Sequence, residues 1–74
     1  MNSRKREAFT RLAEKRTNAV LDKIRVLSNC SNLYVYEYSD EDVKRIFSAI
    51  ETELRAAKAK FQNHRKRQFK LESQ

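Results

Sequence analysis

The sequence predicts an all-α protein: an antiparallel two-helix hairpin that dimerises into a four-helix bundle. The 74 residues contain no glycine and no proline, and 36% are charged; this composition favours long helices over sheets and flexible linkers. Apolar residues recur with helical spacing in two segments of similar length, separated by a polar break. A chain this short buries too little surface to build a deep core alone. We therefore expect a single domain, residues 1–74, that forms a homodimer or binds a protein partner.

The first helix is predicted over residues 3–28. Its apolar stripe advances in steps of three and four residues, which places the side chains on one face of a helix. Further apolar residues widen the stripe, so this helix is expected to contact more than one neighbour. The stripe consists of Phe9, Ala13, Thr17, Val20, Ile24 and Leu27, with Leu12, Ala19, Leu21 and Val26 beside it.

The connector is predicted over residues 29–38. It begins with Ser and Asn side chains, which compete for backbone hydrogen bonds and favour a turn. The following LYVYEY segment has strong β propensity but no second strand to pair with. We predict an extended connector, with pairing between two chains as the alternative. An extended backbone points Tyr34, Tyr36 and Tyr38 the same way, where they either cap the helix pair or form a protein-interaction surface.

The second helix is predicted over residues 39–69, and its start is the clearest local signal in the chain. The hydroxyl of Ser39 is expected to cap the backbone N–H of Asp42, and three successive acids complement the positive end of the helix dipole. Tyr38 and Val43 have the spacing of a hydrophobic staple.

The apolar stripe of the second helix ends near Phe61, and a solvated basic extension follows before the chain frays. Both predicted helices measure on the order of 40 Å, as an antiparallel hairpin requires. The stripe consists of Val43, Phe47, Ile50, Leu54, Ala57 and Phe61, with Ile46 beside it.

Charge is distributed in three blocks. Residues 1–25 hold eight Lys or Arg against three acids, residues 26–54 two against six, and residues 55–74 seven against one. A hairpin places both basic blocks at one pole, where they favour salt-sensitive contacts with the phosphates of DNA or RNA and no base-specific reading. Alternatively, these cations only solvate the helix ends. The expected nucleic-acid-binding residues are Arg4, Lys5, Arg6, Arg11, Lys58, Arg65, Lys66, Arg67 and Lys70, with Lys15 as a further candidate.

We expect no enzyme activity, no catalytic residues, no cofactor and no metal site. His64 is the only histidine, and it has no nearby acid in the sequence to orient it. Cys30 is the only cysteine, so an intramolecular disulfide is impossible, and we expect this side chain to be buried or inert. No apolar run approaches the roughly 18 residues of a membrane span, and no signal peptide is visible. A cytoplasmic protein without membrane contact is therefore expected.

Three segments carry a resemblance to known proteins: RLAEKRTN at residues 11–18, the turn at residues 29–32, and YEYSDEDV at residues 36–43. Over about residues 7–61, the chain resembles short hypothetical proteins encoded in bacterial genomes and their mobile elements. This resemblance implies a bacterial or phage origin and no particular activity. In architecture alone, the predicted hairpin is similar to the plasmid-encoded Rop type of RNA-binding hairpin, which dimerises into a four-helix bundle.

Two functional hypotheses follow. The first is a small regulatory or accessory protein that binds nucleic acid through a basic pole. The alternative is a protein-interaction module of bacterial or phage origin that modulates a host complex through the tyrosine-rich connector or the helix faces. The first predicts strongly salt-dependent binding, and the second predicts dependence on the three tyrosines.

Overall fold

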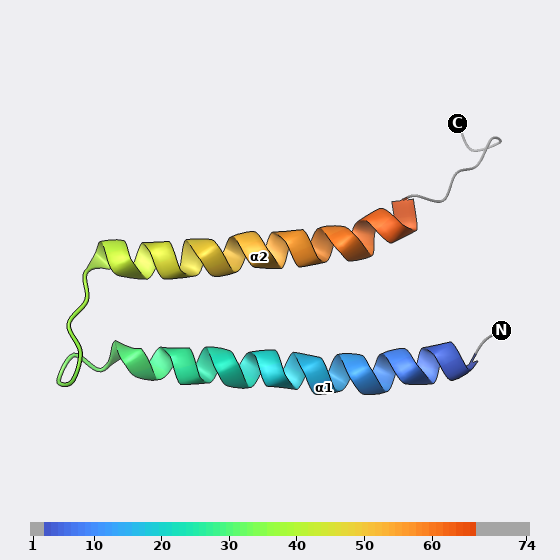
Figure 1. Cartoon of the computed structure of the whole chain (residues 1–74), viewed down its shortest axis with the longest axis horizontal. Coiled ribbons are helices and arrows are strands. Elements are labelled where there is room, and N and C mark those ends of the chain that lie inside the picture. Colours follow the sequence, from blue (N-terminus) through green and yellow to red (C-terminus); the bar gives the residue numbers. More distant parts are fainter. Residues whose placement is uncertain (1–2, 67–74) are drawn as a thin grey trace. The chain divides into compact units, whose positions relative to one another are not determined.

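The computed structural model describes residues 3–66, with side chains described for residues 3–63 (Figure 1). Helix α1 spans Ser3–Ser28, the short 3-10 helix η1 spans Asn29–Ser31, and helix α2 spans Asp40–Lys66. The described part of the chain is all-helical and contains no strand, which confirms the predicted all-α class. Over their described lengths, neither α1 nor α2 has an apolar stretch that could cross a membrane.

Helix α1 has the predicted bounds, and its 26 residues contain no helix breaker. Its C-terminal end is stabilised locally, since the Ser28 hydroxyl donates a hydrogen bond of 2.6 Å to the carbonyl of Arg25. Its apolar stripe stays open to solvent, with Phe9 50% and Val20 52% exposed. Among residues 3–63, no side chain is buried. The apolar stripe therefore has no cover within the described part of its own unit.

The connector differs from the prediction. Residues 33–35 form a turn in which the carbonyl of Asn32 accepts hydrogen bonds from the backbone N–H groups of Val35 at 3.1 Å and Tyr36 at 2.9 Å. The side-chain oxygen of Asn32 also accepts a hydrogen bond of 2.9 Å from the N–H of Tyr34. The expectation of a continuously extended connector is therefore wrong for this part, because the Asn32 side chain offers the backbone a closed turn.

The three tyrosines consequently differ in their surroundings, and the extended backbone that would align them is absent. Tyr34 is 100% exposed and Tyr36 is 51% exposed, whereas Tyr38 is half-buried. Cys30 lies in η1 and is also exposed, so of the two expectations, buried or inert, the first is wrong and the second stays a prediction.

The predicted start of α2 is confirmed in atomic detail. The Ser39 hydroxyl oxygen accepts a hydrogen bond of 3.1 Å from the N–H of Asp42, whose carboxylate accepts one of 2.9 Å from the N–H of Ser39. Asp40 and Glu41 add negative charge to the first turn, where the helix dipole favours it. Tyr38 and Val43, which have the spacing of a hydrophobic staple, are both half-buried, whereas most side chains of residues 3–63 are exposed.

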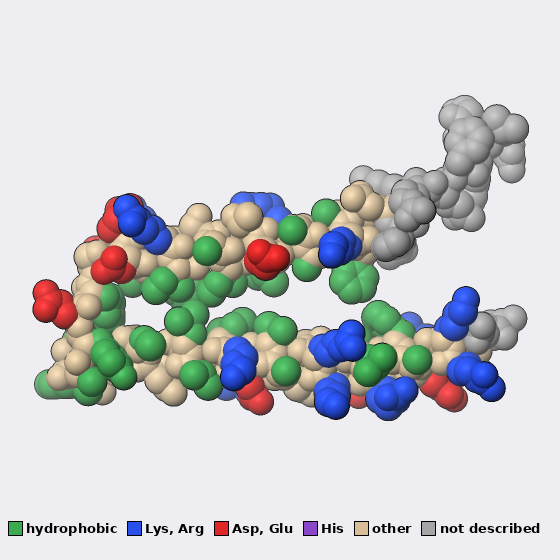
Figure 2. All heavy atoms as spheres, in the orientation of Figure 1, with side chains coloured by type: hydrophobic (Ala, Val, Ile, Leu, Met, Phe, Trp, Pro, Cys, Tyr) green, Lys and Arg blue, Asp and Glu red, His purple; other side chains and the backbone are tan. Residues whose placement is uncertain are grey.

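The apolar stripe of α2 also follows the prediction. Figure 2 shows hydrophobic side chains gathered along one edge of this helix. Val43 and Ile50 are half-buried, whereas Phe61 is 64% exposed. The predicted end of the helix near residue 69 lies outside the described residues.

The chain divides into two units, Met1–Glu37 and Tyr38–Gln74, and each is described by itself. The antiparallel hairpin and its dimerisation into a four-helix bundle therefore stay predictions.

Candidate nucleic-acid interface

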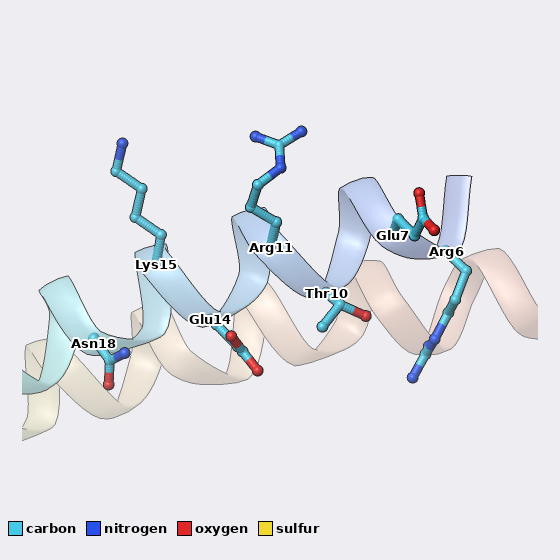
Figure 3. A pocket seen from close by; sticks show the side chains of 7 residues that line it. All are labelled: Arg6, Glu7, Thr10, Arg11, Glu14, Lys15 and Asn18. Atoms are coloured by element: carbon cyan, nitrogen blue, oxygen red, sulfur yellow. The ribbon is translucent and has the colours of Figure 1, made fainter. Parts of the chain in front are cut away.

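Three cations of α1 lie along one line of the helix surface. Arg4, Arg11 and Lys15 are separated by seven and four residues, so they share one face at intervals of about 10 and 6 Å. All three are exposed, and Arg11 and Lys15 extend to the same side of the helix (Figure 3). We call these three residues the basic row. It lies on the opposite side of α1 from the apolar stripe, so covering the stripe leaves the row accessible.

The cations of α1 differ in whether they already have a partner. Arg25 forms an ion pair of 2.7 Å with Asp22, and the guanidinium of Arg6 lies 5.7 Å from the centre of the Phe9 ring, which indicates a cation–π contact. Lys5 also takes part in an interaction. In contrast, no residue of the basic row has a hydrogen-bond or ion-pair partner among the described residues.

Two acids stand close to the basic row. Glu7 precedes Arg11 by one turn and shares its face, whereas Glu14 extends to the opposite side of α1 from Arg11 and Lys15 (Figure 3). Neither acid forms an ion pair with a cation of the row in the described part. The side chains spread along an open helix surface that consists of Arg6, Glu7, Thr10, Arg11, Glu14, Lys15 and Asn18. Such a surface suits a phosphate backbone running along it better than a small substrate, which needs an enclosed pocket.

The first turn of α1 has the opposite charge from the one its own stability favours. It contains no acid, whereas Arg4, Lys5 and Arg6 stand within it or immediately after it. Positive charge at a helix N-terminus opposes the helix dipole by roughly 0.3–1 kcal/mol per charge. Helix α2 shows the favourable arrangement, with three acids in its first turn. The role of these cations in α1 is therefore not explained by local helix stability.

The remaining predicted cations stand in the last part of α2 or follow it in the sequence. Lys58 is exposed and stands beside the apolar stripe. Arg65 and Lys66 belong to the last turn of the helix, but their side chains lie outside the described part, as do Arg67 and Lys70 altogether. Gathering of these residues with the N-terminal cations of α1 requires the predicted hairpin.

Two polar residues that composition and charge do not single out, Thr10 and Asn18, line the open surface of α1. Their side chains point to the same side as Glu14, away from Arg11 and Lys15 (Figure 3). Glu7, Thr10, Glu14 and Asn18 advance in steps of three, four and four residues, which places them on one helix face. This spacing in the sequence could have identified Thr10 and Asn18 as part of that face. In the described residues, no group of three or more His, Cys, Asp or Glu side chains could hold a metal ion.

Comparison of the chain with protein-family models, with curated proteins and with solved structures found no match. Its function therefore has to be inferred from the residues themselves.

Proposed function

We propose that this protein binds nucleic acid without catalysis, through phosphate contacts made by the basic row of α1. The observation that carries the proposal is that Arg4, Arg11 and Lys15 are exposed, share one helix face and lack acidic partners among the described residues. An ion pair must be broken before its cation can bind phosphate, and these three cations avoid that cost. The net charge of +7 attracts a polyanion over longer range.

Backbone recognition is the expected mode. Lys and Arg contacts to phosphate give affinity that falls steeply with salt, and they fix position without reading sequence. We propose a regulatory or accessory role in the cytoplasm, a reducing compartment that suits the single cysteine.

The proposed architecture is the antiparallel hairpin. An isolated helix with an open apolar stripe is marginally stable in water, so α1 and α2 each need a neighbour. Their lengths of 26 and 27 residues match. One register aligns five apolar layers: Leu27 with Phe47, Ile24 with Ile50, Val20 with Leu54, Thr17 with Ala57, and Ala13 with Phe61. A dimer of such hairpins covers what one hairpin leaves open and forms a four-helix bundle.

The test compares two arginine reversals that change net charge equally. Arg11→Glu removes a member of the basic row, whereas Arg45→Glu changes an exposed residue of α2 that lies opposite its apolar stripe. Binding of a fluorescent RNA hairpin and of a DNA duplex is followed by anisotropy between low and moderate salt. Arg11→Glu is expected to weaken binding about tenfold and to reduce the salt slope by about one. Arg45→Glu is expected to change affinity less than about threefold.

Equal weakening by both reversals would mean that only net charge matters and would refute the basic row. Salt-independent affinity would refute phosphate binding altogether.

A second candidate function is protein binding by the turn at residues 33–35. Tyr34 is wholly exposed there, between Leu33 at 69% and Val35 at 66% exposure, and three hydrogen bonds to Asn32 close the turn. Preorganised exposed aromatic residues are typical anchors of interfaces. Tyr34→Ala separates the two functions, because it leaves the basic row intact. Unchanged nucleic-acid affinity in this variant is expected under the first proposal.

A further inference from the structure

The apolar stripe of α2 has the spacing of a helix-packing seam with charged residues on both sides. The seam residues advance in alternating steps of four and three, and Phe47, Leu54 and Phe61 are 47%, 50% and 64% exposed. One side of the seam carries Lys44, Glu51 and Lys58, and the other carries Ile46, Glu53 and Lys60. In helix bundles, charges in these positions select the neighbouring helix and its direction.

Helix α1 has a matching seam with its own charged sides. This seam consists of the five stripe residues of the aligned layers, from Ala13 to Leu27. Glu14, Leu21 and Ser28 lie on one side of it, and Arg16 and Lys23 lie on the other. The charged side chains among them are exposed and have no ion-pair partner in the described part of the chain. They are therefore available to a neighbouring helix.

Two hairpins can form a four-helix bundle in two ways. If they point in opposite directions, α2 lies antiparallel to α2 of the second copy, and antiparallel neighbours bring the same side of both helices together. Full overlap of the α2 seams then places Lys44 against Lys58 of the second copy. On the same side, Glu51 meets Glu51, and on the other side Glu53 meets Glu53. Each of these contacts pairs like charges, which destabilises the interface.

If the hairpins point in the same direction, each α1 lies between α2 of its own chain and α2 of the second copy. In the register of the five apolar layers, one side of α1 then brings Glu14 next to Lys58, and the other brings Lys23 next to Glu53. Both contacts pair opposite charges. Arg16 next to Lys60 is the one unfavourable contact among these charged pairs, so complementarity clearly favours this arrangement.

We propose that a second copy of this chain covers the open seams, with both hairpins pointing in the same direction. One of the pairs Glu14–Lys58 and Lys23–Glu53 then joins helices of the same chain, and the other joins the two copies. In this arrangement both copies contribute to the phosphate-binding surface. That consequence rests on the proposed function, whereas the direction of the hairpins does not. The N-terminal cations of both α1 helices and the C-terminal cations of both α2 helices share one end of the bundle.

The direction of the hairpins is measured with nitroxide labels and pulsed electron paramagnetic resonance. Cys30 is exposed and is the only cysteine, so the natural chain can be labelled at one site near the turn. Hairpins that point in the same direction bring the two labels within about 20 Å, roughly the width of a bundle. Hairpins that point in opposite directions separate them by about 25 Å or more along the helices.

A control label at Thr52, introduced as Thr52→Cys in a Cys30→Ser background, reports pairing itself. Thr52 is exposed near the middle of α2 and opposite its seam, so the labels couple in either arrangement. Coupling at Thr52 with a distance beyond about 25 Å between Cys30 labels overturns the proposed direction. Absence of coupling at both sites overturns the self-association.

Charge reversal supplies an independent measurement, because the four side chains of the two pairs are exposed and helical content can be checked by circular dichroism. Lys23–Glu53 and Glu14–Lys58 are reversed in turn, and each single reversal in the pair that joins the two copies is expected to weaken dimerisation about tenfold, measured by sedimentation equilibrium. The double variant of that pair is expected to recover to within about threefold of the natural chain. Dimerisation left unchanged by the single reversals of both pairs overturns the proposed contacts. Weakening in the double variant equal to the product of the single effects overturns the pairing. Neither measurement contains nucleic acid, so loss of phosphate binding leaves both results intact.

Discussion

The capping interaction at the start of α2 allows a quantitative prediction. The Ser39 hydroxyl accepts the hydrogen bond from the N–H of Asp42 at 3.1 Å, and the Asp42 carboxylate accepts the return bond at 2.9 Å. Ser39→Ala removes the first bond and leaves a helix N–H without its side-chain acceptor. Such a substitution costs about 1 kcal/mol. Because a domain of this size shifts by roughly 4–8 °C per kcal/mol, the thermal midpoint is expected to fall by about 5 °C.

Ser48→Ala provides a matched control. Ser48 is exposed in the interior of α2, and alanine is the better helix former there by about 0.5 kcal/mol. The same chemical change is thus expected to destabilise at residue 39 and to stabilise slightly at residue 48. Thermal unfolding is followed by circular dichroism at one fixed protein concentration, because self-association would make the midpoint depend on concentration.

Asp42→Ala tests whether the two bonds act together. This variant loses the return bond and a negative charge at the helix N-terminus, at a cost of about 1–1.5 kcal/mol. The double variant is expected to cost less than the sum of the single variants, because Ser39 and Asp42 support one another. Equal midpoints for Ser39→Ala and Ser48→Ala would refute the capping role.

Two further predictions concern the first turn of α1 and the turn that follows η1. Arg4→Glu is expected to raise the thermal midpoint by a few degrees, since an acid replaces a cation in the first turn. The same variant is expected to weaken nucleic-acid binding about tenfold in anisotropy titrations. A lower midpoint would contradict the dipole argument. Asn32→Ala removes the acceptor of the Tyr34 N–H, so NMR should show that amide exchanging about five- to tenfold faster. The N–H groups of Val35 and Tyr36, which bond to the Asn32 carbonyl, are expected to change less, and equal acceleration would mean that the whole turn opens.

The helices were predictable because the information that specifies them is local. Steps of three and four residues identify a helical face, and Ser39 with Asp42 three positions later identifies a cap. The connector departs from the prediction because the β propensity of residues 33–38 competes with local hydrogen bonding to the preceding asparagine. Asn32 supplies a backbone carbonyl and a side-chain oxygen to three N–H groups, and this local satisfaction closes a turn that propensity alone does not indicate.

The candidate site was only partly predictable for a different reason. Composition identifies every cation, but it does not show which of them are already engaged. Arg6 lies over Phe9, and Arg25 pairs with Asp22, whereas Arg11 has no such partner among the described residues. The sequence does not reveal this distinction. Arg6–Phe9 and Asp22–Arg25 are each three residues apart, but other residues of α1 with the same spacing form no such contact in the described part, so the difference depends on side-chain conformation. The structure therefore reduces a broad basic segment to a few available cations.

In the proposed bundle, the gathering of positive charge links self-association to ligand binding. Each copy carries a net charge of +7, and hairpins that point in the same direction concentrate their basic ends at one pole, where the charges repel one another. The opposite direction would separate these ends but would bring like charges together beside the α2 seam, as at Glu51 or at Glu53, at shorter range than the charges of the pole. We expect the short-range charge pairs beside the seams to determine the direction of the hairpins. The repulsion between the basic ends of the two copies is then left uncompensated. A bound polyanion relieves that repulsion, so phosphate binding and dimer formation stabilise one another.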